Sequence, residues 1–284
     1  MQDIGLLING NKPYALQLAC ELKALLNEQG LCYREYTFLK GNDSEEPSTD
    51  FFKDKSLVIS IGGDGTLLAA LRHCVEFDVP VLGINGGRKG FLIEIAKDDI
   101  KEAVKRLQYE DFFIEERQML SANVYDSEDH IIAQHELAMN DFSVSRQGHA
   151  RMLQMEIMIN DELAEHIDAD GVLLSSPTGS TAYSLSAGGP VVMPGVACTL
   201  ITPICAHSLH TRPLVVPDTV RIRVNARDRL NDVLLTIDGQ RSIEVPPGGY
   251  IIATKAPKCA KFVRFEKQNY YKKYRDKMIQ WSMI

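Results

Sequence analysis

The chain has 284 residues, 45% of them hydrophobic, which is enough for one large or two medium folded domains. Its formal charge of -7 argues against a broad nucleic-acid surface and against a face that attracts membranes. No apolar run approaches the ~18 residues of a membrane span, and the start lacks the pattern of a signal peptide, so we expect a cytoplasmic protein. The six cysteines form no C-x-x-C pair and no metal-like spacing with histidines, which predicts free thiols.

The first 115 residues alternate predicted strands and helices. Strands are expected at residues 4–8, 31–38, 56–61 and 79–84, helices at 14–29, 67–74 and 98–108, and a surface loop at 40–50. This alternation predicts a Rossmann-like, doubly wound α/β domain, in which the ligand lies beyond the carboxyl ends of the strands.

After about residue 115, polar and apolar residues alternate instead, which is typical of half-exposed antiparallel strands. Such strands are expected at residues 153–159, 219–224 and 233–239, with a tight turn at 246–249 and a basic, aromatic helix at 270–281. We therefore predict an α/β domain over residues 1–115, a β-rich, β-sandwich-like domain over 116–260, and a C-terminal helix within 261–284 that packs back on the first domain.

The most informative local feature is the sequence from Gly62 to Thr66, Gly-Gly-Asp-Gly-Thr, between a predicted buried strand and a predicted helix. Its glycines let the main chain approach a ligand closely, and the amides at a helix start can hold a phosphate. Asp64 lies in the middle of this turn, where its charge would repel a phosphate unless it handles a hydroxyl or a metal ion. This conflict indicates phosphoryl transfer, with simple capping of the helix by Asp64 as the alternative.

The densest polar cluster lies between Ser175 and Ser186, where seven Ser or Thr hydroxyls and one Tyr follow a predicted short strand. Hydroxyls that lead into a helix start offer hydrogen bonds to phosphate and ribose oxygens. The alternative is a surface loop in which Ser and Thr cap the helix.

Two shorter segments also present polar side chains after predicted strands. Asn140 can pair with adenine, and the neighbouring Asp141 can take a ribose hydroxyl, but an ordinary Asn-Asp turn explains the pair as well. Residues 238–240, Asp-Gly-Gln, are similarly either ligand contacts or a hairpin turn.

Several common kinds of site are excluded by their spacing. His207, His210 and Arg212 lie close together but have no carboxylate at ligand spacing, so they make a poor metal site. The serines lack a nucleophile-elbow pattern, and neither a G-x-x-x-x-G-K-[ST] loop nor a complete G-x-G-x-x-G occurs.

Taken together, these motifs resemble the NAD kinase family. The resemblance spans nearly the whole chain, through residues 62–66, 85–92, 140–141, 170–171, 176–190, 202–214, 238–240 and the C-terminal helix. Diacylglycerol-type lipid kinases share the Gly-Gly-Asp-Gly-Thr motif, whereas the long hydroxyl segment followed by His207-Ser-Leu and Arg212-Pro-Leu favours the NAD branch.

The resemblance implies an enzyme that uses ATP to phosphorylate the 2′-hydroxyl of the adenosine ribose of NAD, giving NADP. It further implies a divalent cation, Mg²⁺ or Mn²⁺, and a homodimer or homotetramer, and some family members accept polyphosphate in place of ATP. Asp64 would be the catalytic base, Gly65 would bind near the transferred phosphate, and Asn140 would contact adenine.

The resemblance also implies a wider set of NAD contacts. These are Asp64, Gly65, Asn140, Asp141, Arg151, Asp168, Asp170, Thr181, Ala182, Tyr183, Ser184, Leu185, Ser186 and Gln240. The chain departs from the family at two of them. Family members usually carry Asn-Glu in place of Asn140-Asp141, and basic residues are familiar at the position of Asp168.

Two other functions are compatible with these motifs. A lipid kinase of the same superfamily would want a membrane-facing patch, and a non-catalytic NAD or NADP sensor would have no need of Asp64 inside a phosphate turn. The preference between NAD and NADH, the choice between ATP and polyphosphate, the metal ligands and any feedback by NADP stay open at this point.

Overall fold

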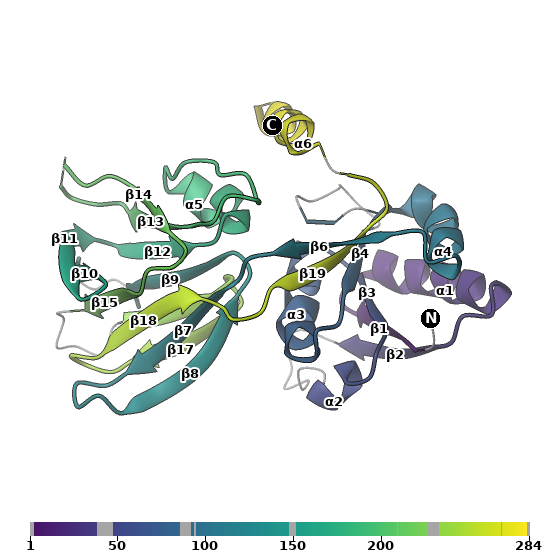
Figure 1. Cartoon of the computed structure of the whole chain (residues 1–284), viewed down its shortest axis with the longest axis horizontal. Helices are drawn as coiled ribbons and strands as arrows, with labels where there is room; N and C mark the ends of the chain where they lie inside the picture. The colour runs from purple at the N-terminus through teal and green to yellow at the C-terminus, as the bar shows by residue number, and fades with distance from the viewer. Residues whose placement is uncertain are drawn as a thin grey trace. The chain divides into compact units, whose positions relative to one another are not determined.

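Two units make up the fold of the computed structural model, which describes residues 3–38, 48–85, 92–93, 95–147, 152–208, 210–226, 233–267 and 269–282, without the side chains of 280–282. Unit 1 comprises Met1–Glu116 and Ala260–Ile284, and unit 2 comprises Arg117–Cys259 (Figure 1). Of the described helices, none is both long and apolar enough to span a bilayer.

Unit 1 is built on a sheet of seven described strands in the order β2-β1-β3-β4-β19-β6, with β5 paired to β4. The strands are β1 (Ile4–Asn9), β2 (Tyr33–Phe38), β3 (Leu57–Ile61), β4 (Val81–Asn85), β5 (Ile95–Ala96), β6 (Phe113–Arg117) and β19 (Ala260–Arg264). Strand β1 pairs in parallel with both β2 and β3, and β4 pairs in parallel with β3, β5 and β19. The order of strands therefore reverses between β1 and β3, which is where a doubly wound sheet binds its ligand.

Helices cover both faces of this sheet. Helices α1 (Pro13–Glu28) and α4 (Ile100–Gln108) pack on one face against alternate residues of β1 and β3, such as Leu6 and Ile59. The other face carries α2 (Thr49–Phe52) and α3 (Asp64–Cys74), because a Cβ built on Gly83 would lie 3.2 Å from Leu67 of α3. The buried apolar runs of β1, β3 and β4 are those expected of strands covered on both sides, so the predicted α/β domain is confirmed.

The C-terminal helix α6 (Tyr270–Ser282) follows β19, which the sequence analysis did not predict as a strand. Glu115 of β6 links the two elements, because its carboxylate accepts a hydrogen bond from the Tyr270 hydroxyl and another, of 2.6 Å, from Nε of the buried Arg264. A further Arg264 nitrogen donates to the Leu92 carbonyl over 3.1 Å, so one guanidinium joins three segments of unit 1.

Unit 2 is a sandwich of two sheets, each with six described strands, and these strands pair in antiparallel fashion. One sheet has the order β11-β10-β15-β18-β7-β8, and the other has the order β14-β13-β12-β9-β16-β17. The strands of the first are β7 (Leu120–Tyr125), β8 (Ile131–Ala138), β10 (Leu153–Ile159), β11 (Glu162–Ala169), β15 (Ile222–Ala226) and β18 (Tyr250–Lys255). Those of the second are β9 (Asp141–Arg146), β12 (Gly171–Ser175), β13 (Cys198–Ile204), β14 (Leu214–Pro217), β16 (Val233–Ile237) and β17 (Arg241–Val245).

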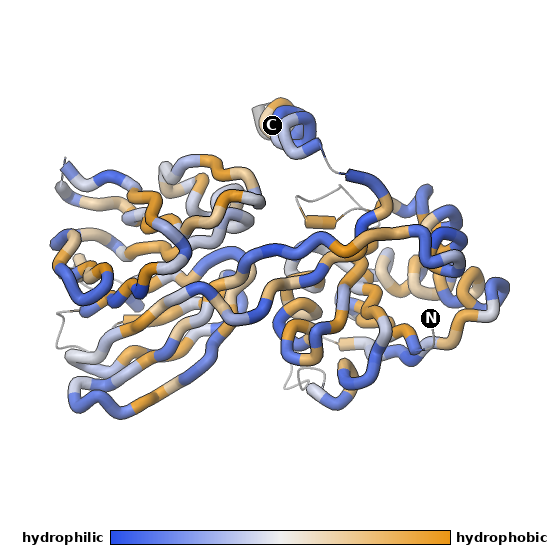
Figure 2. Tube along the Cα trace, in the orientation of Figure 1, coloured by the Kyte–Doolittle hydropathy of each residue, from blue (hydrophilic) through white to orange (hydrophobic). Residues whose placement is uncertain are grey.

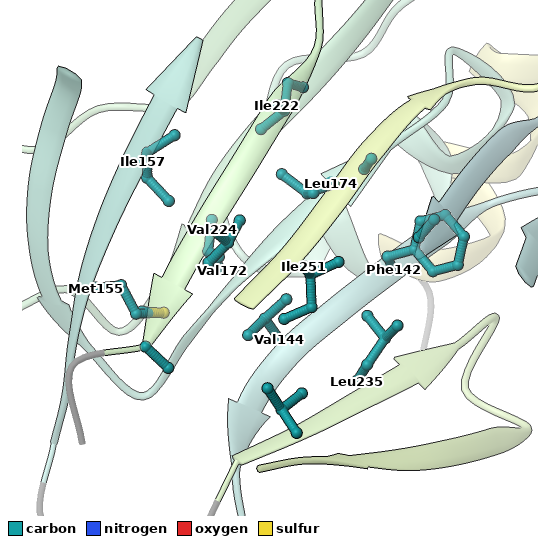
Figure 3. Close-up of a cluster of buried hydrophobic side chains, with 14 of the residues drawn as sticks. Phe142, Val144, Met155, Ile157, Val172, Leu174, Ile222, Val224, Leu235 and Ile251 are labelled. Atoms are coloured by element: carbon teal, nitrogen blue, oxygen red, sulfur yellow. The ribbon is translucent and has the colours of Figure 1, made fainter. Parts of the chain in front are cut away.

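A single hydrophobic core fills the space between the two sheets of unit 2. Met155, Val224 and Ile251 enter it from the first sheet, and Val144 and Leu174 enter it from the second (Figure 3). Hydrophobic and hydrophilic residues alternate along these strands, as Figure 2 shows, because one face of each sheet is turned to the core. The predicted β-rich, sandwich-like architecture is thereby confirmed.

Some predicted bounds were wrong, for local reasons. The strand expected over 219–224 begins only at Ile222, because Pro217–Val220 forms a turn that Val220 N closes on the Pro217 carbonyl over 3.4 Å. The strand expected to reach residue 239 ends at Ile237. The loop expected over 40–50 gives way to α2, whose start is capped by the Ser48 hydroxyl, and residues 39–47 lie outside the described part.

Candidate functional site

The glycine turn of unit 1, residues 62–66, lies at the switch point of the sheet. It follows β3 directly, Gly63 precedes the first turn of α3, and Asp64 is the first helical residue. Asn9, the last residue of β1, donates from its side-chain nitrogen to the Thr66 hydroxyl oxygen over 3.0 Å. The carboxyl ends of β1 and β3 are thus tied together at the position where a doubly wound sheet binds its ligand.

Gly62 of this turn is needed for close packing, and the surroundings of Gly63 locate a nearby cation. A Cβ on Gly62 would lie 2.3 Å from the Thr66 hydroxyl oxygen, and one on Gly63 would lie 2.9 Å from Nζ of Lys12. The ammonium group of Lys12 therefore lies against the turn, although nothing in the spacing of the sequence predicted it. A cation beside a helix start favours an anionic ligand such as phosphate.

In unit 2, the predicted Asn140-Asp141 pair forms a tight connection between β8 and β9. The carboxylate of Asp238 accepts hydrogen bonds from three successive main-chain nitrogens there, those of Met139 (3.0 Å), Asn140 (2.7 Å) and Asp141 (3.1 Å). The Asp238 nitrogen donates in return to the Asp141 carbonyl over 2.9 Å. Segments that lie far apart in the sequence are thus joined by a single side chain.

The hydroxyl segment, residues 175–186, also bonds to the connection between β8 and β9. Ser176 donates from its main-chain nitrogen to the Asn140 carbonyl over 2.8 Å and from its hydroxyl to the Met139 carbonyl over 2.6 Å. The approach is so close that a Cβ on Gly179 would lie 2.0 Å from the Asn140 carbonyl oxygen. Three segments that the sequence analysis singled out separately therefore come together in unit 2.

Asp141 is a buried acid of this cluster with a strongly raised pKa. Its side chain is buried, and the loss of water raises the pKa of its carboxyl from 3.8 to about 7, with a further contribution from the negative charge of Asp238. A carboxyl with such a pKa exchanges its proton near neutral pH, so it can either accept a hydrogen bond from a ribose hydroxyl or donate one.

Tyr183 and Asp170 are two further predicted contacts that lie in unit 2. Burial raises the pKa of the Tyr183 phenol, and Cys205, Asp141 and Asp170 add smaller electrostatic contributions in the same direction. Asp170 also forms an ion pair with Arg146, whose Nη2 lies 3.1 Å from a carboxylate oxygen, both side chains being about one-third exposed. Asp141 and Asp170 lie at opposite ends of the β9–β12 pair, where Ser175 pairs with Asp141 and Gly171 pairs with Ser145, and the charge of each acts on Tyr183.

Several hydroxyls of the hydroxyl segment form hydrogen bonds within the protein. The Ser180 hydroxyl donates to the Pro177 carbonyl over 2.6 Å, Thr181 donates to the Thr178 carbonyl over 3.1 Å, and the fully buried Ser184 pairs with Thr202 over 2.9 Å. These bonds stabilise the 3-10 turn (Thr178–Thr181) and the short helix α5 (Tyr183–Ser186). Tyr183 and Ser186 are exposed, and Ala182 and Leu185 are half-buried.

The remaining predicted residues are more dispersed. Asp168 is exposed on β11, where its carbonyl accepts from the His207 nitrogen over 2.8 Å, and Gln240 is half-exposed just after Asp238. Arg151 and residues 86–91 lie outside the described part of the chain. Within the described part, no three His, Cys, Asp or Glu side chains gather as a metal site would require.

The structure adds Lys12, Arg146, Ser176 and Asp238 to the residues that the sequence analysis selected as site residues. Ser176 and Asp238 stood within the quoted motifs, but their contacts span 37 and 98 residues of sequence, so local spacing carried no signal for them. Lys12 lies between the predicted strand at residues 4–8 and the predicted helix at 14–29. Its place after the end of a strand was the one feature of the sequence that could have indicated a role at the site.

Two family patterns and a full-length relative relate this chain to NAD kinases. The sequence pattern of the ATP-NAD kinase N-terminal domain matches residues 43–112, and that of the ATP-NAD kinase C-terminal domain matches residues 139–265. The chain is 36% identical over 286 residues to the NAD kinase of Desulforamulus reducens, covering 99% of both chains.

Two solved structures are similar to the chain as a whole. Yeast NADH kinase complexed with NADH has a TM-score of 0.82 and 25% identity, covering 95% of this chain and 84% of that one. An NAD kinase from Archaeoglobus fulgidus in complex with ATP has a TM-score of 0.76 and 24% identity, covering 94% of this chain and 95% of that one, and this likeness concerns the fold.

Proposed function

The chain belongs to the NAD kinase family, and from that premise we propose that it transfers the terminal phosphoryl group of ATP to the 2′-hydroxyl of the adenosine ribose of NAD, giving NADP. The observation that carries this proposal is the carboxylate of Asp64 within a glycine turn at the switch point of a parallel sheet. A simple phosphate-binding turn has no use for a negative charge at this place, whereas a kinase needs a group that takes the proton of the attacking hydroxyl.

In this mechanism Asp64 is the general base. As the bond between ribose O2′ and the phosphorus forms and the bond from phosphorus to the ADP oxygen breaks, the 2′-hydroxyl proton passes to the Asp64 carboxylate. Phosphoryl transfer through a loose transition state requires little base strength early in the reaction, so an ordinary aspartate suffices. Lys12, which lies against the turn, is a cation that can stabilise charge on the phosphates.

Most of the proposed dinucleotide contacts belong to unit 2, while Asp64 and Gly65 belong to unit 1. Asn140 contacts adenine through its side-chain amide, and Asp141 takes a ribose hydroxyl. The hydrogen bonds from Ser176, at the start of the hydroxyl segment, to the Met139 and Asn140 carbonyls support this assignment. The other contacts proposed from the family resemblance are Gly65, Arg151, Asp168, Thr181, Ala182, Ser184, Leu185, Ser186 and Gln240.

We treat the divalent cation, Mg²⁺ or Mn²⁺, as part of the nucleotide substrate. Such an ion binds chiefly through substrate phosphates and water, with one or two protein carboxylates. When bound, the ion neutralises phosphate charge.

Two further properties are proposed, the location from the sequence pattern and the oligomeric state from the family resemblance. The protein would act in the cytoplasm, and all six of its cysteines are free thiols in the structure, as a reducing compartment favours. It would assemble as a homodimer or homotetramer, which light scattering of the purified protein tests directly.

The first experiment is an assay of NADP formation by the purified protein with NAD, ATP and Mg²⁺, with the Asp64→Asn variant alongside. The expected result is turnover by the wild type and its loss in the variant. Phosphorylation of diacylglycerol vesicles instead of NAD would favour the lipid kinase. Tight NAD binding without turnover from either ATP or polyphosphate would favour a sensor.

A further inference from the structure

The main chain between Met139 and Asp141 is bonded in an unusual way. Its three N–H groups donate to the side chain of Asp238, its first two carbonyls accept from the hydroxyl and the nitrogen of Ser176, and its third accepts from the nitrogen of Asp238. Two distant residues thus provide partners for all six main-chain polar groups of this connection, which we call the Asn140 turn.

This arrangement favours a ligand contact over an ordinary Asn-Asp turn, the two explanations of Asn140 that the sequence left open. In an ordinary turn, an Asn side chain closes the turn by bonding to nearby main-chain groups. Here that task is carried out by Ser176 and Asp238. Among the described residues no hydrogen bond uses the side-chain amide of Asn140, and this side chain is only half-buried. Its donor and acceptor atoms are therefore available to a ligand.

We propose that Asp238 and Ser176 are positioning residues that hold the Asn140 turn so that the Asn140 amide is presented in one orientation to the dinucleotide. The inference rests on the proposed contact between Asn140 and adenine. A side chain recognises a base edge by two directed hydrogen bonds, so an error in the direction of its Cα–Cβ bond weakens both. The close contact of Gly179 with the Asn140 carbonyl restricts the turn further.

The two residues offer variants of different severity. Asp238→Asn keeps the size of the side chain but replaces one acceptor oxygen by an NH₂ group, which must then face a main-chain N–H. Ser176→Ala removes the bond to the Met139 carbonyl and the acceptor for Gly179 N, 3.1 Å away, and it keeps the main-chain bond to Asn140. Ser176→Ala therefore carries the test if Asp238→Asn does not fold.

The experiment measures the Kd for NAD by calorimetry, together with kcat, KM for NAD, KM for ATP and Tm. It uses wild type, Asp238→Asn, Ser176→Ala and Asn140→Ala, and the two double variants that contain Asn140→Ala. Matched controls are Asp161→Asn, at an exposed turn aspartate of unit 2 that pairs with Arg221, and Ser242→Ala, whose hydroxyl pairs with Thr236.

Asp238→Asn is expected to weaken NAD binding and raise KM for NAD by about 10- to 100-fold, the range expected when a charge-assisted hydrogen bond is lost. Ser176→Ala should have a smaller effect in the same direction, of about 3- to 10-fold. KM for ATP should stay unchanged for both. In the Asn140→Ala background, each substitution should change NAD binding by less than about 2-fold, because coupled residues are not additive.

Asp238→Asn and Ser176→Ala could weaken NAD binding as much in the Asn140→Ala background as in the wild type. That result would overturn the positioning role, while the proposed contact between Asn140 and adenine would still stand. Equal increases in KM for NAD and ATP, together with a lower Tm, would show a general structural role and would also overturn it. If Asn140→Ala itself binds NAD like the wild type, the proposed adenine contact fails, and the inference fails with it.

Discussion

The glycine turn of unit 1 and the Asn140 turn of unit 2 are built in opposite ways, which suits the different ligand groups that we propose for them. The glycine turn spans residues 62–66 of a single strand–turn–helix unit and offers a close main-chain approach, as phosphate binding requires. In the Asn140 turn, distant residues bond the main-chain groups, and the proposed ligand contact is made by the side chain of Asn140. A phosphate is recognised by its charge, so the main-chain amides of one continuous segment can bind it. A base edge is recognised by hydrogen bonds with fixed directions, so it needs a side chain whose main chain is held in place.

The largest effect is expected from Asp64→Asn, which tests the chemistry of the glycine turn. It should lower kcat by about 10²- to 10⁴-fold, the usual contribution of a positioned acid–base group, because the amide cannot accept the proton. NAD binding and Tm should stay close to the wild-type values. Steady-state kinetics measure this, with Asp54→Asn, at an exposed turn of unit 1, as the control. An unchanged kcat would remove Asp64 from its role.

The second prediction concerns the buried acid of the Asn140 turn and the pH dependence of stability. Because the pKa of Asp141 is raised from 3.8 to about 7, the folded protein binds one more proton than the unfolded chain between these pH values. The stabilisation is complete at low pH and is lost as the pH rises through about 7. Between pH 5 and 8 the wild type should therefore lose about 2 to 3 kcal/mol more unfolding free energy than Asp141→Asn.

Urea denaturation at several pH values measures this difference. Asp161→Asn, at an exposed aspartate, should keep the wild-type pH dependence. The same slope in wild type and Asp141→Asn would mean that the Asp141 carboxyl titrates as it does in water.

Gly179→Ala tests how closely the hydroxyl segment must approach the Asn140 turn. The added methyl group would lie 2.0 Å from the Asn140 carbonyl oxygen, so we expect a loss of about 1 to 3 kcal/mol in stability and weaker NAD binding. Thermal unfolding and calorimetry measure the two effects. Gly195→Ala, where a Cβ has no neighbour within 4 Å, is the matched control. A Gly179→Ala variant as stable as this control would contradict the close contact.

The smallest effect is expected at Lys12, beside the glycine turn. Lys12→Met removes the ammonium group and keeps the apolar stem, and it should raise KM for ATP by about 3- to 10-fold, as loss of a half-exposed charge contact would. KM for NAD should change little. Lys53→Met, at an exposed lysine of the same unit, serves as the control. An unchanged KM for ATP would mean that Lys12 only packs against the turn.

The two turns also differ in how far the sequence predicted them. For the glycine turn, the strand, the glycines, Asp64 and the helix are consecutive, so the sequence predicted the whole unit and its place at the edge of a parallel sheet. Only Lys12 was missed, because it reaches the turn from the end of the neighbouring strand. The alternating segments of the second half likewise predicted a β-rich sandwich, although turns shortened two of the strands.

The sequence by itself determined the two architectures and the segments that carry polar chemistry, because periodicity and turn residues act over a few neighbours. It also displayed Asn140, Ser176 and Asp238, but only as members of separate segments. Tertiary structure decided how these three residues come together. It also decided the burial that raises the pKa of Asp141 and the formation of strand β19. Each of these depends on pairing between residues far apart in the chain, and such pairing leaves no local pattern in the sequence.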